Sequence, residues 1–287
     1  MTDFGKLLNS LASVKVGVIG DVMLDTYMWG RVERISPEAP VPVVTVEKKE
    51  YRIGGAGNVA LNLKALGAAV SVLSITGGDS DGHILIDLFK QNNINTKHLL
   101  KANDRITTNK TRVLSRSQQM MRLDAEIALD ITEEQQQQLL KEIKEFIETE
   151  KPQVIIFEDY NKGVLTVPVI NEVIKLCREA GIITAVDPKQ KNFFAYKGAD
   201  IFKPNMKEVR DALSLSAEEV SLTALQQIHG ELNDRLQHCY SFITLSEKGV
   251  FFQGKDESGI IPSHVRSIAD VSGAGDTVIA TASLVYA

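Results

Sequence analysis

The sequence predicts an α/β fold in which a mostly parallel central sheet is flanked by helices. Residues 15–20 form a short apolar run that ends in glycine, which is typical of a buried strand at the start of such a sheet. From residue 54 onward, similar apolar runs alternate with stretches of helical periodicity, and this alternation favours parallel strands joined by helices. Because 287 residues are enough for one large core, we interpret residues 1–287 as a single domain.

Residues 23–53 interrupt this pattern. Side chains alternate over residues 43–46 and helical periodicity is weak, so we expect a small excursion of extended strands. Pro37, Pro40 and Pro42 lie within six residues and predict a stiff hinge, since each ring fixes φ and removes a hydrogen-bond donor.

Regular elements follow in order. A helix over residues 57–66 ends at Gly67, and a strand at 70–76 and an amphipathic helix at 81–92 come next. Residues 107–124 predict two strands in a hairpin about residues 115–118.

The second half of the chain continues the alternation. Thr132 and Gln135 have the spacing of a capping box and begin a helix that we expect to reach about residue 149. Another helix starts at Thr166, with Pro168 in its first turn. The predicted strands of this half are residues 154–157, 182–186, 201–203, 242–245 and 250–253.

Composition excludes several classes of protein. The formal net charge of −5 argues against a general nucleic-acid binder. The N-terminus lacks a secretory pattern and no apolar run approaches membrane-spanning length, so we expect a cytoplasmic protein with no membrane partner. Cys177 and Cys239 have no paired spacing, and we expect both to be reduced core residues.

The most informative motif spans residues 270–277. Its glycines allow a tight turn just before an apolar helical run, so the amides of Gly273, Ala274 and Gly275 would lie at a helix N-terminus. Such a terminus binds anions without a lysine. Asp276 would lie beside it, where a general base is useful. A site for negative charge next to a base suits transfer of a phosphoryl group to a hydroxyl.

Carboxylates follow the first predicted strand. Asp21 and Asp25 lie at the edge where open α/β sheets bind ligands. Ionised carboxylates accept strong hydrogen bonds from sugar hydroxyls. Turn and capping chemistry is the alternative interpretation of this pair.

A glycine-rich segment precedes the helix at residues 57–66. Gly54 and Gly55 allow close approach to a ligand, and Asn58 can both donate and accept hydrogen bonds. Residues 55–60 also satisfy G-x-G-x-x-A, the dinucleotide fingerprint. Because they do not follow the first strand, a dinucleotide site is the weaker alternative.

Residues 105–122 form a basic stretch without an acidic residue. If residues 110–116 are extended, Lys110, Arg112 and Arg116 share one face of a strand, because side chains alternate. In a net-acidic protein this face suits a phosphate group on the substrate. A solvated strand face is the alternative.

Polar residues also follow the later strands, at the sheet edge where the turn at residues 270–277 is expected. Lys189 could contact a phosphate, and Asn205 and Glu208 could order Mg²⁺ and its waters, although capping is the alternative for each. Ser246, Glu247 and Gly249 form a turn at the same edge. The sequence contains neither a P-loop nor the ligand spacing of a zinc site.

Residues 270–277 resemble the D-T-G-A-G-D signature of ribokinase-like (PfkB-type) carbohydrate kinases, with Val271 and Ser272 in its middle. Residues 54–60 resemble the N-terminal glycine signature of that family. The resemblance covers almost the whole chain, and it is most specific for the branch that phosphorylates D-glycero-D-manno-heptose 7-phosphate. The strings that carry this second likeness are residues 20–25, 34–44, 112–116, 121–124 and 159–163.

The resemblance implies a ribokinase-like, ATP-dependent kinase that phosphorylates O1 of the heptose 7-phosphate on the ADP-heptose route to lipopolysaccharide. Asp276 would take the proton of the hydroxyl, and Gly273, Ala274 and Gly275 would hold charge on the transferred group. The sugar phosphate would be bound by Asp21, Asp25, Gly54, Gly55, Asn58, Arg112 and Arg116. ATP and Mg²⁺ would be bound by Lys189, Asn205, Glu208, Ser246, Glu247 and Gly249, with Asn205 and Glu208 reaching Mg²⁺ through water.

The resemblance has structural consequences as well. Residues 23–53 and 107–124 would form a small β lid, which in this family often mediates a homodimer contact. Family members continue through further helices, so we expect the C-terminal end at Ala287 to be truncated, and Glu158 stands where a small residue is expected. The alternatives are another sugar or nucleoside kinase of the same fold, and a sugar-phosphate-binding protein without catalytic activity.

Overall fold

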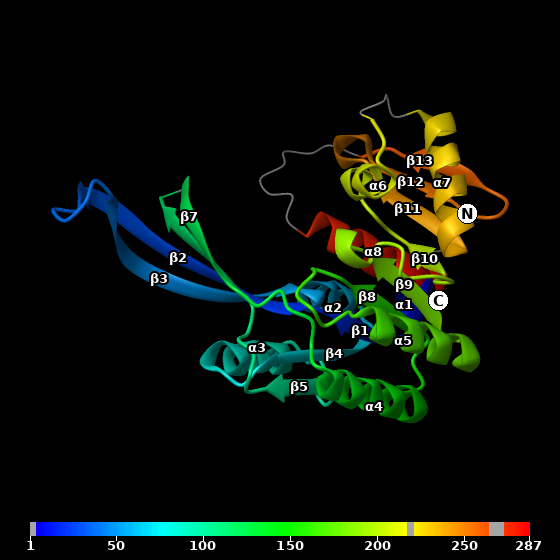
Figure 1. Cartoon of the computed structure of the whole chain (residues 1–287), viewed down its shortest axis with the longest axis horizontal. Coiled ribbons are helices and arrows are strands. Elements are labelled where there is room, and N and C mark those ends of the chain that lie inside the picture. Colours follow the sequence, from blue (N-terminus) through cyan, green and yellow to red (C-terminus); the bar gives the residue numbers. More distant parts are fainter. Residues whose placement is uncertain (1–3, 117, 217–220, 264–272) are drawn as a thin grey trace.

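A central sheet of nine strands runs through the part of the chain that the computed structural model describes, residues 4–116, 118–216, 221–263 and 273–287 (Figure 1). In spatial order they are β13 (Ser258–Ile261), β12 (Val250–Gln253), β11 (Tyr240–Thr244), β10 (Ile201–Phe202), β9 (Ile183–Asp187), β8 (Val154–Glu158), β1 (Lys15–Gly20), β4 (Ala69–Gly77) and β5 (Leu99–Ala102). Seven neighbouring strands, from β11 to β5, pair in parallel, and the two pairings at the other edge, of β11 with β12 and of β12 with β13, are antiparallel.

The strand order reverses beside β1. From β1 the chain passes to β4 and β5 on one side, and then crosses to β8 on the other side and continues outward to β11. Val16 is paired with Val70 of β4 and with Val154 of β8. In open α/β sheets, ligands bind outside the carboxyl ends of the strands at such a switch point. The fold therefore indicates that a ligand site lies near the residues that follow β1 and β8.

The central strands contribute side chains to two hydrophobic cores, one on each face of the sheet, because successive side chains point to opposite faces. In β1, Ile19 belongs to one hydrophobic cluster and Val18 to the other. One face is covered by α1 (Phe4–Leu11), α2 (Ala56–Ala65), α3 (Ser80–Gln91) and α8 (Ala274–Tyr286). The other face is covered by α4 (Glu133–Glu150), α5 (Val167–Ala180), α6 (Met206–Leu213) and α7 (Leu222–Leu236).

The expected capping signals are present at the helix starts. Thr132 and Gln135 form a reciprocal capping box at the start of α4, with N–H···O distances of 3.0 and 3.2 Å. The Thr166 side chain accepts from the amide of Val169 at the start of α5. These caps satisfy amides that the helix itself leaves unpaired, so the helix boundaries were readable from local sequence.

A second sheet projects from the main body (Figure 1). Its spatial order is β3 (Pro42–Gly55), β2 (Val22–Ile35), β6 (Asn109–Ser115) and β7 (Gln118–Ala125). We call these four strands the small sheet. The prediction of a hinge at the prolines is wrong: residues 36–41 form the turn between β2 and β3, where the amide of Ser36 donates to the carbonyl of Val41 at 2.8 Å, and Pro42 begins β3.

Several elements were not predicted from the sequence. β5 and β13 have four residues each, too few for a clear periodicity, and neither α1 nor the 15-residue α7 was expected. Both cysteines are free; Cys177 is buried in α5 as expected, whereas Cys239 is exposed, so its assignment to the core is wrong. Among the described helices, none combines the length and apolar character that crossing a membrane requires.

Candidate active site

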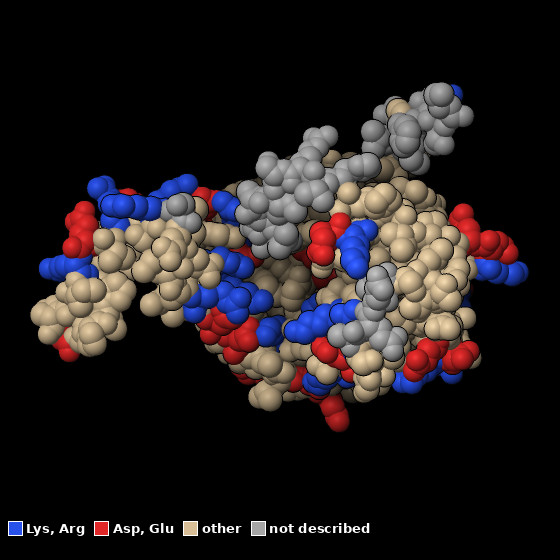
Figure 2. Space-filling model, turned by 90° about the horizontal axis from the view of Figure 1, so that it is seen from above, with Lys and Arg blue, Asp and Glu red and all other residues tan. Residues whose placement is uncertain are grey.

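A pocket of about 260 Å³ opens where the small sheet meets the start of α2 and the start of α8. Figure 2 shows Lys and Arg side chains gathered around a hollow between the small sheet and the main body. The pocket is lined by Met23, Asp25, Tyr27, Arg52, Ile53, Gly54, Gly55, Asn58, Lys110, Arg112, Tyr160, Gly273 and Asp276. Eight of these are residues that the sequence analysis had selected: Asp25, Gly54, Gly55, Asn58, Lys110, Arg112, Gly273 and Asp276.

Two glycines shape the helix starts at this pocket. Gly55 caps α2 with φ of 58°, and Gly273 caps α8 with φ of 80°, both in the left-handed region that favours glycine. A Cβ on Gly273 would lie 2.7 Å from the side-chain nitrogen of Asn58. The close approach of α8 to α2 therefore requires glycine at residue 273. Residues 270–272, the first part of the signature, lie outside the described residues.

Asp276 is held in the first turn of α8 by two partners. Asn58 donates from Nδ2 to one carboxylate oxygen at 2.5 Å, and the Tyr160 hydroxyl donates to the other at 3.3 Å. Burial raises the pKa of Asp276 above its ordinary value, although the hydrogen bond from Asn58 lowers it. The carboxylate is fixed in orientation while one side of it faces the pocket.

Asp21 is not part of the pocket lining. Its buried carboxylate accepts three backbone hydrogen bonds, from the amides of Tyr160, Lys162 and Val164 at 2.8, 3.0 and 3.1 Å. Burial raises its pKa, and these amides oppose that effect. Asp21 therefore holds the loop after β8 that brings Tyr160 to Asp276.

Asp25 lies on β2 and faces Arg112 of the neighbouring strand β6. Arg112 Nη1 is 2.5 Å from Asp25 Oδ1, and the Arg112 guanidinium also lies 5.2 Å from the centre of the Tyr27 ring. Arg52 of β3 lies over the same ring at 4.5 Å. Tyr27 thus supports two guanidinium groups at the small-sheet side of the pocket.

The basic wall of the pocket differs from the one expected from sequence. Arg112 and Lys110 line it, but Arg116 is exposed in the turn beyond β6, with φ of 54°. Arg52 was missed, because only the register of the small sheet places it opposite Asp25. Burial lowers the pKa of Lys110, and nearby Lys162 lowers it further.

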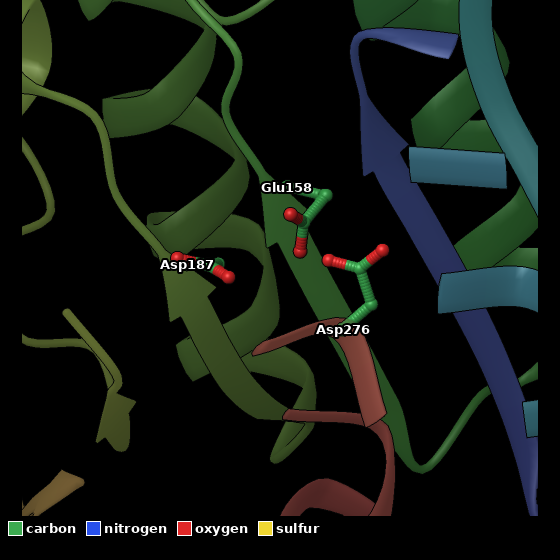
Figure 3. A group of neighbouring side chains, drawn as sticks. All are labelled: Glu158, Asp187 and Asp276. Carbon is green, nitrogen blue, oxygen red and sulfur yellow. The ribbon is translucent and has the colours of Figure 1, made fainter. Parts of the chain in front are cut away.

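Two further carboxylates, those of Glu158 and Asp187, lie close to that of Asp276. Figure 3 shows Glu158 at the end of β8, Asp187 at the end of β9 and Asp276 of α8 pointing toward one another. One oxygen from each lies within 4.8 Å of the others. Lys203 Nζ contacts Asp187 at 2.7 Å. Burial raises the pKa of Glu158 well above its ordinary value, and the neighbouring carboxylates of Asp187 and Asp276 raise it further.

Asn205 and Glu208 form reciprocal hydrogen bonds at the start of α6. The Asn205 side chain accepts from the Glu208 amide at 2.9 Å, and Glu208 Oε2 accepts from the Asn205 amide at 2.8 Å. The other oxygen of Glu208 is 2.5 Å from Lys189 Nζ. Burial lowers the pKa of Lys189, but Asp187 and Glu208 outweigh it and the net shift is upward. These oxygens serve a capping box and an ion pair in this structure.

The remaining predicted residues lie at the same edge of the sheet. Ala274 and Gly275 are the first residues of α8, and a Cβ on Gly275 would lie 3.2 Å from Lys203 Nζ. Ser246 and Glu247 are exposed in the short 3-10 helix η2 (Ser246–Lys248), and Gly249 is buried just after it.

A larger apolar groove of about 780 Å³ includes Ala274 and Thr277, on either side of Asp276 in the sequence. It runs along α8 and faces β11 to β13. Its lining consists of Ile201, Tyr240, Phe242, Val250, Glu257, Ile261, Ala274, Thr277, Val278, Thr281, Ala282, Val285 and Tyr286. The start of α8 therefore separates a polar, basic pocket from an apolar groove. A ligand with a flat apolar group and a charged tail would suit both sides of that helix start.

The chain matches the model of the pfkB family of carbohydrate kinases over residues 14–286. Among curated proteins, the bifunctional protein HldE of Desulfatibacillum aliphaticivorans is 41% identical over 276 residues, covering 95% of this chain and 55% of that protein. The bifunctional protein HldE of Magnetococcus marinus is 41% identical over 266 residues, covering 92% of this chain and 54% of that protein. The chain thus spans about half the length of these relatives.

Solved structures share the fold at low sequence identity. The tetrameric inhibited form of phosphofructokinase-2 from Escherichia coli superposes with a TM-score of 0.76 at 17% identity, covering 94% of this chain and 86% of that one. A ribokinase from Arabidopsis thaliana, complexed with ribose and ATP, gives a TM-score of 0.73 at 14% identity over 96% of this chain and 86% of that one. The predicted ribokinase-like fold is confirmed.

Proposed function

This chain belongs to the pfkB family of carbohydrate kinases, and from that premise we propose that it transfers the γ-phosphoryl group of ATP to O1 of D-glycero-D-manno-heptose 7-phosphate. The observation that carries this proposal is the pocket in which Asp276 faces a wall of basic side chains, Arg52, Lys110 and Arg112. An unphosphorylated sugar would need no such wall. A sugar that already carries a phosphate uses it as an anchor, because guanidinium groups bind phosphate strongly.

Asp276 is the proposed general base. In the proposed step, the O1 oxygen forms a bond to the γ-phosphorus of ATP while the bond to the bridging β–γ oxygen breaks and ADP leaves. The proton of the O1 hydroxyl passes to Asp276. Asn58 and Tyr160 support this role because they hold both carboxylate oxygens in place.

The first turn of α8 is the proposed anion site. Gly273, Ala274 and Gly275 precede Asp276 at the helix N-terminus, where unpaired amides and the helix dipole favour negative charge. Charge that develops on the transferred phosphoryl group would be stabilised there. Glycine at residue 273 supports this arrangement, because a side chain would meet Asn58.

The hydroxyl groups and the phosphate group of the sugar would contact different sides of the pocket. Asp25, Asn58 and the backbone at Gly54 and Gly55 suit the sugar hydroxyls, and Arg112 with its basic neighbours suits the 7-phosphate. Asp21 contributes indirectly through the loop that it anchors. Arg116 is exposed beyond β6 and is not part of the proposed site.

ATP would approach from the other side of α8. The apolar groove suits the adenine ring, and Lys189 and the turn at Ser246, Glu247 and Gly249 lie on the same edge of the sheet. Mg²⁺, when bound with ATP, supplies positive charge that offsets the phosphates. The buried carboxylates fit such an ion, because both oxygens of Glu158 lack a hydrogen-bond partner within the described structure.

The small sheet is the proposed lid and dimer interface. Its edge strand β7 is exposed along its length and carries three exposed apolar side chains, Met120, Met121 and Leu123. Exposed apolar edge strands favour pairing with another chain. The likeness to the heptose-kinase branch supports a place in the ADP-heptose route to lipopolysaccharide, in the cytoplasm.

The deciding experiment measures ADP release with ATP and Mg²⁺ against a panel of acceptors. We expect turnover with D-glycero-D-manno-heptose 7-phosphate, and a KM for the same heptose without its phosphate that is higher by at least ~10²-fold, the scale of about 3 kcal/mol for a lost charged contact. Phosphorus NMR of the product would show the new phosphate on O1. Turnover with an unphosphorylated sugar and none with the heptose 7-phosphate would refute the assignment.

A further inference from the structure

Residues 159–166, which follow β8, form neither helix nor strand, and we call them the Tyr160 loop. Asn161 has φ of 54° and Gly163 has φ of 92°, so the backbone turns sharply twice within the loop. Such a loop lacks the regular hydrogen bonds that fix a helix or strand, and contacts from other segments must hold it. Its position matters because the Tyr160 hydroxyl donates to Asp276 at 3.3 Å.

Asp21 holds the Tyr160 loop by its amides, and Arg105 holds it by a carbonyl. Arg105 Nη2 donates to the carbonyl of Lys162 at 2.7 Å. The same guanidinium donates to the carbonyls of Leu129 at 2.9 Å and Ile127 at 3.5 Å. These acceptors are backbone atoms, so Arg105 fixes the path of the chain both in the Tyr160 loop and in the segment after β7.

The same two segments make further contacts around Arg105. Lys162 Nζ is 2.7 Å from Glu126 Oε1, at the end of β7. The amide of Ile131 donates to the carbonyl of Gly163 at 3.0 Å, and a Cβ on Gly163 would overlap the carbonyl oxygen of Leu129. The Tyr160 loop is therefore attached closely to the chain that leaves the small sheet.

The guanidinium of Arg105 suits this junction. It carries N–H donors in a planar fork, which can contact several carbonyls at once, whereas an ammonium is a compact point charge. Arg105 is half-buried; burial lowers its pKa, and the negative charge of Asp21 opposes that effect. Hydrogen bonds from a charged donor are strong, so loss of this side chain would release the carbonyl of Lys162.

We propose that Arg105 is a positioning residue for phosphoryl transfer, which holds the Tyr160 hydroxyl against Asp276 through the Tyr160 loop. Arg105 does not line the pocket, and the carbonyl that it holds lies two residues after Tyr160. Its effect on the reaction is therefore indirect. The inference rests on the proposed function, because Asp276 is the base of that proposal.

Arg105 is also connected to the basic wall of the pocket. It lies between β5 and β6, and β6 carries Lys110 and Arg112. Lys110 Nζ lies 5.6 Å from the centre of the Tyr160 ring. One guanidinium thus joins the segment that leads into the basic wall to the loop that carries a partner of the proposed base.

A double-mutant cycle tests whether Arg105 acts through Tyr160. Tyr160→Phe removes the hydroxyl and should lower kcat about tenfold, the scale for a hydrogen bond to a charged group. Arg105→Met removes the donors and should lower kcat by a similar factor, while the KM for the acceptor stays within about threefold. The double variant should be no slower than the slower single variant, because both changes remove the same contact.

Two further variants complete the kinetic test. Arg235→Met, at an exposed position on α7, is the matched control and should leave kcat unchanged. Arg105→Lys keeps the charge but not the fork, so its kcat should lie between those of the wild type and Arg105→Met. Circular dichroism establishes that each variant folds, and Arg105→Lys replaces Arg105→Met in the cycle if the latter does not fold.

Fluorine NMR gives a readout without catalysis. Labelling with 3-fluorotyrosine marks the six tyrosines, and Tyr160→Phe identifies the signal of Tyr160 by its loss. In the ligand-free protein, Arg105→Met should shift and broaden that signal, because the Tyr160 loop is no longer held. Arg235→Met should leave it at its wild-type position.

Three results would overturn the proposal. An unchanged Tyr160 signal in Arg105→Met would show that Arg105 does not hold the loop. A normal kcat in Tyr160→Phe would show that the contact with Asp276 is not used. Losses of kcat that multiply in the double variant would show that Arg105 acts independently of Tyr160. Failure of the heptose assignment is a separate outcome, since it changes the acceptor panel and leaves the fluorine spectra intact.

Discussion

The side-chain amide of Asn58 donates a hydrogen bond to Asp276 at 2.5 Å, although 218 residues separate the two in sequence. This contact joins the start of α2 to the start of α8, which come from the two signature motifs of the chain. It fixes one oxygen of the carboxylate and leaves the group at the wall of the polar pocket. The first prediction concerns this carboxylate.

Asp276→Asn should lower kcat by at least ~10²-fold, because loss of a general base removes that much of the rate. Asparagine keeps the size of the side chain, so binding of the sugar phosphate should change little. Steady-state ADP release measures kcat, and calorimetry measures sugar binding. Asp87→Asn, an exposed change on α3, is the control with normal kcat. A kcat near that of the wild type would place the base elsewhere.

Arg112→Met should raise the KM for heptose 7-phosphate by ~10- to 10²-fold, because a charge-assisted contact to phosphate contributes about 1.5–3 kcal/mol. The matched control is Arg116→Met, four residues further along and exposed in the turn beyond β6. Its KM should stay within about twofold. Acceptor titrations measure both values. Equal effects of the two variants would mean that the phosphate lies further out along the small sheet.

Asp21→Asn should lower the free energy of unfolding by about 2–3 kcal/mol. The carboxylate accepts three backbone amides, and asparagine replaces one acceptor oxygen with an NH₂ group that faces a donor. Urea denaturation followed by circular dichroism measures the loss. Asp234→Asn, an exposed change on α7, should have almost no effect. If Asp21→Asn were as stable as the wild type, Asp21 would not anchor the loop that carries Tyr160.

The stability of the protein should fall as the pH drops from 6.5 toward 4, and His238 should account for part of that fall. Burial and, to a smaller extent, the neighbouring His229 together lower the pKa of His238 to about 4. Its Nε2 lies 2.6 Å from the hydroxyl of Ser241. An unfolded histidine takes up its proton near pH 6.5. Acid therefore favours the unfolded state, by about 2–3 kcal/mol near pH 4.5.

Urea denaturation at pH 7 and pH 4.5 checks this contribution. His238→Gln should reduce the difference in unfolding free energy between the two pH values by about 2–3 kcal/mol. His83→Gln, at an exposed position on α3, should leave that difference unchanged. An unchanged pH dependence in His238→Gln would show that other groups carry the acid sensitivity.

Leu123→Lys on β7 should convert a dimer into monomers, if the small sheet forms the interface. The side chain is 54% exposed, so the substitution should not disturb the core. Light scattering coupled to size-exclusion chromatography measures the molar mass against protein concentration. Lys6→Leu on α1, outside the small sheet, is the control. A wild-type protein that is monomeric at all concentrations would refute the proposed interface.

Much of the fold was accessible from the sequence, because its signals are local. The capping box of Thr132 and Gln135 and the cap at Thr166 mark helix starts through contacts of three residues or fewer. Apolar runs such as residues 15–20 mark buried strands. The prolines at residues 37–42 were misread as a hinge, since their rigidity is local but their place at the far turn depends on strand length.

The candidate site was only partly accessible, because strand register is a property of pairs of strands. Arg52 is opposite Asp25 only through the pairing of β3 with β2. Arg116 was grouped with Arg112 by alternation, but β6 ends at Ser115 and leaves Arg116 in the turn. Asp21 and Asp25 look alike in sequence, yet one binds backbone amides and the other lines the pocket.

The sequence by itself determined the α/β architecture, the two glycine-rich helix starts and Asp276 beside one of them, because these depend on residues close together in the chain. Only the tertiary structure decided that Glu158 and Asp187 lie close to Asp276. It also decided that Asn205 and Glu208 hydrogen-bond to one another in a capping box. Those relationships depend on burial and on contacts between distant elements. The residue type gives the ordinary charge of a side chain, but the packing of the sheet and helices around it determines which groups it contacts.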